Sequence, residues 1–112
     1  RLVASMLAKK FRLQIQNWLK DKGKKINARK SDFFIVKIAA NGLNFSRFGV
    51  VISRKVSKSA VRRNKIKRTI FDFIRLNGYY KISGKDVLIT VLPPTGKFKK
   101  SEIENELNRL LA

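Results

Sequence analysis

The residues with the clearest chemical potential form one run of cations in the middle of the chain. Between residues 47 and 68 there are nine Lys or Arg residues and no Asp or Glu. Guanidinium and ammonium groups bind phosphate oxygens through charge-assisted hydrogen bonds, and each neutralised phosphate releases counterions. The run therefore predicts a binding site for a polyanion. Its members are Arg47, Arg54, Lys55, Lys58, Arg62, Arg63, Lys65, Lys67 and Arg68.

The overall composition favours the same kind of partner and excludes several kinds of enzyme. The 112 residues include 27 Lys or Arg and 7 Asp or Glu, a formal charge of +20, and 44% are hydrophobic, enough for one core. The absence of Cys and His excludes disulfides, zinc fingers, thiol nucleophiles and imidazole acid–base catalysis. Seven scattered carboxylates leave little room for a protein-built metal site or a two-carboxylate hydrolase. What remains is binding to a polyanion.

A membrane surface is the competing anion. The most apolar windows, residues 33–40 and 87–92, are about half as long as a membrane span requires, and no signal-peptide pattern opens the chain. A Cys-free chain fits a reducing compartment, so we expect a soluble cytoplasmic protein without a membrane partner. Binding to anionic lipid stays open as an alternative, because residues 3–19 could form a basic amphipathic helix.

The periodicity predicts one α+β domain over residues 1–112, with a basic N-terminal helix and connection over 1–30 and an α/β core over 31–112. The expected order is α-β-β-α-β-α. A helix is predicted from about Val3 to Leu19, then a basic connection too polar to pack. Two strands, 32–39 and 45–54, are expected to form a hairpin around Asn41-Gly42. A helix from Ser59 to Asn77, a strand over 85–92 and a helix opened by a Ser101–Glu104 capping box complete the chain.

The cation run overlaps the predicted start of the helix at Ser59. A helix N-terminus carries partial positive charge, so cations in its first turns cost some tenths of a kcal/mol each. Selection for stability alone would place Asp or Glu there. A bound anion reverses the sign of this effect, which favours a ligand-binding role over a merely solvated helix face.

One hexapeptide in this run, Arg63-Asn64-Lys65-Ile66-Lys67-Arg68, follows the segment Gly49-Val50-Val51-Ile52-Ser53-Arg54-Lys55-Val56. Together these segments resemble the signature of the bacterial ribonuclease P protein family. The resemblance implies an α/β sandwich, ribosomal protein S5 domain 2-like, with a left-handed βαβ crossover. That handedness departs from the usual right-handed rule.

The resemblance also implies a function. The protein would join a catalytic RNA subunit and bind the 5′ leader of precursor tRNA, assisting endonucleolytic removal of the leader. Catalysis and the Mg²⁺ ions would belong mainly to the RNA subunit, with no metal and no catalytic residue in this chain. The alternative is a ribosomal or other structural RNA-binding protein, which would share the charge and fold but need no leader site.

Two sets of site residues follow from matching this sequence to the family's pattern. Phe11 could equally be plain core, and Ser53, Arg54 and Lys55 could be a charged strand end that only blunts the sheet edge. The implied contacts to the RNA subunit are Arg62, Arg63, Asn64, Lys65, Lys67 and Arg68. The implied contacts to the leader are Phe11, Ile15, Phe34, Lys37, Ser53, Arg54, Lys55 and Lys58.

Overall fold

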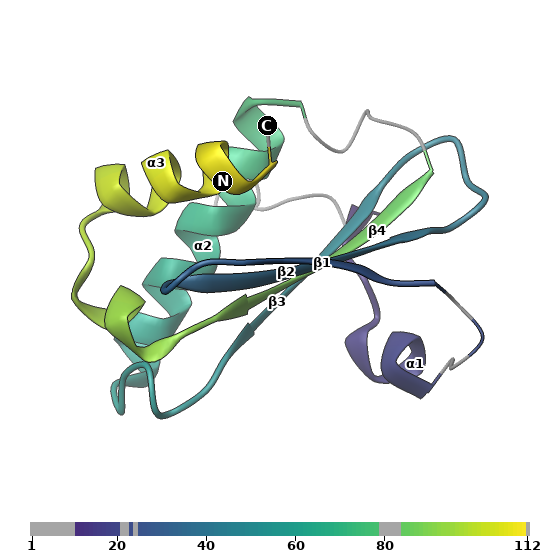
Figure 1. Ribbon diagram of the computed structural model, residues 1–112. Helices are drawn as coiled ribbons and strands as arrows, with labels where there is room; N and C mark the ends of the chain where they lie inside the picture. The colour runs from purple at the N-terminus through teal and green to yellow at the C-terminus, as the bar shows by residue number, and fades with distance from the viewer. Residues whose placement is uncertain (1–10, 21–22, 24, 79–83, 112) are drawn as a thin grey trace.

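A single four-stranded sheet separates two layers of unequal size (Figure 1). The computed structural model describes residues 11–20, 23, 25–78 and 84–111. Helices α2 and α3 pack on one face of the sheet, and the short helix α1 lies on the other. The elements are α1 (Ile15–Lys20), β1 (Asn27–Lys30), β2 (Phe34–Ala40), β3 (Arg47–Ile52), α2 (Ala60–Leu76), β4 (Lys85–Val91), the 3₁₀ helix η4 (Pro93–Lys97) and α3 (Lys100–Leu111).

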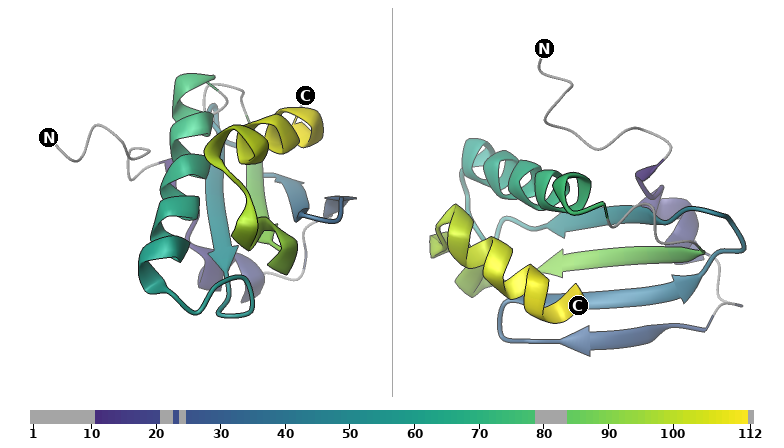
Figure 2. Two further views of the ribbon diagram at one scale, coloured as in Figure 1. Left: turned by 90° about the vertical axis from the view of Figure 1, so that its left-hand side faces the viewer. Right: turned by 90° about the horizontal axis from the view of Figure 1, so that it is seen from above.

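The strand order is β1-β2-β4-β3, so the predicted hairpin of β2 with β3 is wrong. β4 lies between them, antiparallel to β2 and parallel to β3 (Figure 2). The turn signal itself is correct, since Gly42 has a φ of 72°. A turn reverses the chain locally but does not choose a strand's neighbour. β4 takes the centre because residues 86–89 are all buried, and α2 makes the crossover that parallel neighbours need.

Strand β1 was not predicted. It pairs antiparallel with β2 at the sheet edge, where Ala28 lies opposite Lys37, and all four of its residues are exposed. Its Arg29 donates from Nη1 to the carbonyl oxygen of Leu110 at 2.7 Å, which ties the edge strand to α3. The order of elements is therefore α-β-β-β-α-β-α. An exposed, charged edge strand carries almost no hydrophobic pattern, which is why the sequence did not reveal it.

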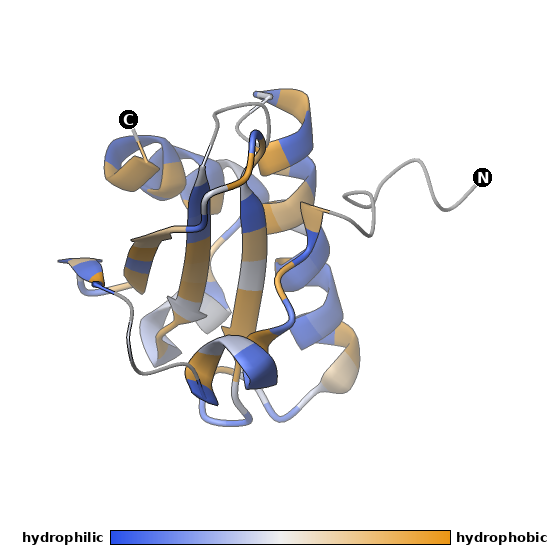
Figure 3. Cartoon of the chain, turned by 90° about the vertical axis from the view of Figure 1, so that its right-hand side faces the viewer, coloured by the Kyte–Doolittle hydropathy of each residue, from blue (hydrophilic) through white to orange (hydrophobic). Residues whose placement is uncertain are grey.

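The helix predicted from Ser59 to Asn77 is confirmed as α2, together with the apolar stripe that its three- and four-residue spacing implies. Ile66, Ile70, Phe73 and Ile74 are buried against the sheet, and Ser59 caps the helix by accepting a hydrogen bond from the Arg62 amide. In α3 the stripe is also confirmed, but the predicted capping box is wrong by two residues. There Glu102 accepts from the Lys99 amide at 2.9 Å, and the helix begins at residue 100. Hydrophobic colours follow the strands and the inner sides of these helices, and hydrophilic colours gather outside (Figure 3).

Within the described residues the predicted N-terminal helix begins only at Ile15, because residues 11–14 are not α-helical. Arg12 bridges to Phe48 as a parallel strand residue, and the Leu13 amide donates to the Phe48 carbonyl at 2.8 Å. Phe11 packs toward the core under α2, whereas Leu13 enters the cluster on the opposite face. Phe11 thus lies on the α2 side of the sheet, whereas Leu13 and Ile15 both lie on the opposite side. Residues 3–10 of the predicted helix lie outside the described residues.

Candidate RNA-binding surface

A hydrogen-bonded turn, residues 53–58, follows β3 and leads into α2. The Ser53 hydroxyl accepts from the Lys55 amide at 3.3 Å, and the Ser53 carbonyl accepts from the Val56 amide at 3.1 Å. The Ser57 hydroxyl accepts from the Ser59 amide at 3.2 Å. Because these backbone groups bond within the turn, its shape does not depend on the cationic side chains. Those side chains, Arg54, Lys55 and Lys58, are exposed.

Arg62 holds the fold together at this end of the sheet. Its Nε donates to the Gly96 carbonyl at 3.1 Å, and its Nη2 donates to the Phe98 carbonyl. Gly96 in turn lies against the turn, since a Cβ at this position would be 2.2 Å from the carbonyl oxygen of Val56. η4 therefore fixes both the start of α2 and the turn. Two donors of Arg62 are already used, so fewer remain for the predicted contact to an RNA subunit.

Arg63 has a similar internal role. Its Nη1 donates to the Ser57 carbonyl at 2.8 Å and to the Lys58 carbonyl at 3.2 Å, and the residue is half-buried. The bonds close the turn onto the first turn of α2. The sequence prediction placed Arg62 and Arg63 among the RNA contacts together with Lys65, Lys67 and Arg68, because no local pattern shows which guanidinium finds carbonyl partners.

The remaining predicted residues at this end form an exposed face. Within the described part of the chain the ion pairs are Arg47–Asp86, Arg75–Asp72 and Arg109–Glu106, and none involves this face. We call it the free cation surface. It consists of Arg54, Lys55, Lys58, Asn64, Lys65, Lys67 and Arg68.

Ile15 and Lys37 lie on the other face of the sheet. Ile15 packs against the buried cluster that includes Leu88, and Lys37 pairs opposite Leu88 and so projects to the same face. Their neighbours Ile35 and Thr90 form a cross-strand pair and are only half-buried. This face is therefore partly open, with a lysine at its centre.

The two predicted aromatic contacts are placed differently. Phe34 is 0% exposed in the core under α2 and α3, so its ring offers no surface to a nucleobase. The prediction that Phe34 contacts the leader is therefore wrong, and Phe34 is a core residue. Phe11 is half-buried and meets Phe45 edge to face, with ring centroids 5.4 Å apart. β2 presents alternate side chains to opposite faces, so Phe34 and Lys37 could never share one surface.

Comparison with known proteins decides the family. The family model described as Ribonuclease P matches residues 7–112. The chain belongs to the ribonuclease P protein family. The ribonuclease P protein component of Chromobacterium violaceum is 36% identical over 84 residues, which cover 75% of this chain and 69% of that protein. The component of Syntrophus aciditrophicus is 35% identical over 78 residues, covering 70% and 65% respectively.

Solved structures of ribonuclease P proteins have the same fold. A mutant of the Staphylococcus aureus protein superposes with a TM-score of 0.80 at 25% identity, over 92% of this chain and 86% of that one. The Thermotoga maritima protein superposes with a TM-score of 0.72 at 27% identity, over 88% and 94%. The α+β fold expected from the resemblance is thus confirmed.

Membership in the ribonuclease P family associates this chain with an endoribonuclease complex and implies partnership with ribonuclease P RNA. Among the described residues, no group of three or more carboxylates could hold a metal ion. No helix in that part of the chain is long and apolar enough to cross a membrane.

Two residues that could contribute to such a partnership were missed by the sequence prediction. Lys30 on β1 pairs opposite Ile35 and therefore projects to the same sheet face as Lys37. Thr90 on β4 adds a hydroxyl to this face. The only signal for Lys30 would have been the alternation of side chains between the two faces of β1. All four residues of β1 are exposed, so no apolar residue marks one of those faces.

Proposed function

We propose that this chain acts in the cytoplasm as the protein subunit of ribonuclease P and binds two RNA elements. The free cation surface would contact the catalytic RNA subunit through α2 and border the path of the precursor tRNA leader through the turn 53–58. The open sheet face around Lys37 would take the single-stranded leader. The complex would remove the leader by hydrolysing one phosphodiester bond and leave the mature 5′ end of the tRNA.

One observation carries this proposal: the cations at the start of α2 divide into two kinds. Arg62 and Arg63 donate to backbone carbonyls, whereas Lys65, Lys67 and Arg68 have no carboxylate partner in the described structure. Cations crowded at a helix start destabilise the isolated protein, and phosphate contact reverses that cost. A hydrogen-bonded base carrying cations without carboxylate partners is what a phosphate-binding surface requires.

The open sheet face offers the leader a different kind of contact. Lys37 supplies a charge for a phosphate, and Ile35 supplies an apolar surface beside it. A single strand presents both base faces and phosphates, so a groove with cations and apolar side chains suits it. Ser53 follows β3 directly, where the strand leads into the turn.

We infer that Mg²⁺ is held mainly by the RNA subunit and that this chain contributes no metal ligand set. The described carboxylates form no group of three, so the described residues do not fit a magnesium site built from protein ligands alone. The protein's contribution is then to neutralise phosphates and orient the leader. Catalysis would reside in the RNA.

Reconstitution tests the proposal. The purified chain is added to the ribonuclease P RNA of Chromobacterium violaceum, and cleavage of a precursor tRNA is followed at several Mg²⁺ concentrations. We expect the protein to lower the Mg²⁺ requirement and to increase cleavage at the correct site. RNA binding without either effect would favour the alternative, a structural RNA-binding protein. Binding to anionic vesicles but not to RNA would overturn both.

A further inference from the structure

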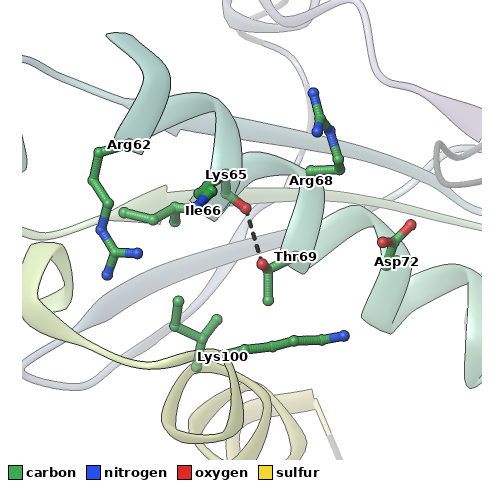
Figure 4. A pocket seen from close by; sticks show the side chains of 8 residues that line it. Arg62, Lys65, Ile66, Arg68, Thr69, Asp72 and Lys100 are labelled. Atoms are coloured by element: carbon green, nitrogen blue, oxygen red, sulfur yellow. Dashed lines mark hydrogen bonds between the residues drawn. The ribbon is translucent and has the colours of Figure 1, made fainter. Parts of the chain in front are cut away.

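A groove of about 340 Å³ runs between α2 and α3 on the side away from the sheet (Figure 4). Its floor includes Ile66 and Ile103, which are each 1% exposed and pack the two helices together. Lys65 and Arg68 stand on the α2 rim, and Lys100 comes from the first turn of α3. In Figure 4 the Lys100 side chain extends along the groove below Thr69. The groove is thus a rigid hollow with cations from two elements.

These three cations have no carboxylate partner in the described part of the chain. Lys65 and Arg68 are three residues apart on one helix face and repel each other, and Lys100 lies where the α3 dipole is positive. Both arrangements slightly destabilise the free protein. An anion in the groove would relieve both.

The groove also has one negative side chain. Asp72 lines it and lies 3.8 Å from Arg75, measured from Oδ1 to Nη2, with 21% of its side chain exposed. A carboxylate repels phosphate, so an anion would bind nearer to Lys65 and Lys100 than to Asp72. Removing the charge of Lys100 is therefore expected to weaken anion binding, and removing the charge of Asp72 is expected to strengthen it.

We propose that the groove between α2 and α3 binds a phosphate of the RNA subunit, with Lys100 as a contact that the family signature does not include. This inference rests on the proposed function and extends it from α2 to α3. RNA is favoured over an acidic peptide because Lys65 and Arg68 belong both to the groove and to the free cation surface. A polyanion bound along α2 therefore passes the opening of the groove.

Salt-dependent binding of the full chain to the ribonuclease P RNA of Chromobacterium violaceum tests the inference. If Lys100 neutralises one phosphate, Lys100→Gln lowers the slope of log K against log salt by about 0.7 to 0.9, whereas Lys100→Arg keeps the slope. Asp72→Asn should tighten binding, because it removes the repelling charge. Lys85→Gln and Asp32→Asn are the charge-matched controls, since both residues are exposed and neither lines the groove. Lys85→Gln should change RNA binding less than Lys100→Gln, and Asp32→Asn should change it less than Asp72→Asn.

Cross-linking gives an independent readout. The chain has no Cys, so Lys100→Cys provides one site for a thiol-linked photocross-linker. The control is Asn105→Cys, on the exposed side of α3 about 160° around the helix from the buried stripe. We expect RNA cross-links from residue 100 and few from residue 105.

The outcomes separate the two proposals. The groove inference is overturned if Lys100→Gln changes RNA binding no more than Lys85→Gln does and residue 100 gives no cross-link. If Lys67→Gln still weakens RNA binding in that case, the proposed function stands. If the unmodified chain binds no ribonuclease P RNA, both are overturned. Thermal melting of each variant excludes unfolding as the cause, and a melted Lys100→Gln would itself contradict a purely surface role.

Discussion

Arg63 donates from Nη1 to the carbonyl oxygen of Ser57 at 2.8 Å, so the first residue of the signature hexapeptide closes a turn of its own chain. A second bond from the same nitrogen reaches the Lys58 carbonyl at 3.2 Å. The residue thus positions the cations around it. Substitution of Arg63 tests this structural role.

Arg63→Ala should lower the free energy of unfolding by about 1 to 2 kcal/mol, because it removes hydrogen bonds from a charged donor. Thermal and urea unfolding measure the loss. Arg68→Ala is the matched control, since Arg68 is exposed and has no ion pair in the described residues. Equal stability for the two variants would contradict the turn-closing role.

Arg68→Ala should weaken binding to ribonuclease P RNA and leave the melting temperature unchanged or slightly higher. The side chain lies on α2 among other cations, so its loss removes repulsion in the free protein. Titrations at several stated salt concentrations should show a slope smaller by about 0.7 to 0.9 for one lost phosphate contact. A large fall in melting temperature would instead indicate a structural residue.

Gly96→Ala should destabilise the protein by about 1 to 3 kcal/mol or more, as overpacked sites do. The new Cβ would meet the Val56 carbonyl oxygen at 2.2 Å, which is backbone and cannot rotate away. Gly42→Ala is an informative comparison, because nothing lies within 4 Å there and only the positive φ opposes it. If Gly96→Ala lowers the free energy of unfolding less than Gly42→Ala does, the close approach of residue 96 to the Val56 carbonyl is refuted.

Arg47→Ala should destabilise the protein more than Asp86→Asn. Asp86 is 4% exposed and accepts from Arg47 Nε at 2.8 Å and Nη2 at 2.7 Å, bonds that also raise the pKa of Arg47. Removing the arginine leaves a buried carboxylate with Asn41 as its remaining donor, at a cost of about 2 kcal/mol. Removing the carboxylate instead frees an arginine whose side chain is 35% exposed and can be hydrated. Urea unfolding of both variants and of the double variant decides the order.

Lys55→Ala and Lys37→Ala should reduce affinity for precursor tRNA but not for mature tRNA, which lacks the leader. Lys55 lies in the turn and Lys37 on the open sheet face, so the pair tests both ends of the proposed leader path. Lys85→Ala serves as a control for the loss of one charge. Equal losses for the two tRNA forms would remove the substituted lysine from the leader site.

The sequence predicted those parts of the fold that depend on local pattern. The stripe Ile66, Ile70 and Ile74, the start of the helix near Ser59 and the Gly42 turn are all confirmed, because each is decided within a few residues. Long-range pairing is different. Nothing near residue 40 indicates that residues 85–91 will insert beside it, and the exposed strand β1 has no apolar pattern to detect.

The candidate site divides in the same way. The exposed cations at 65, 67 and 68 follow from helical geometry alone. The internal bonds of Arg62 depend on carbonyls 34 and 36 residues farther along the chain, which no local pattern indicates. The placement of Phe34 was missed because its neighbour Phe33 obscures the alternation that fixes which face each residue occupies.

The central position of β4 has a consequence for synthesis. Among the described elements β4 is the last strand in chain order, yet it supplies the pairing partner for both β2 and β3. Until residue 91 has emerged, the inner edges of two apolar strands stay unpaired, and unpaired edges promote aggregation. The nascent chain already carries the cations of residues 47–68 and grows beside ribosomal RNA. Translation speed between α2 and β4 should therefore govern how much of this protein escapes misassembly.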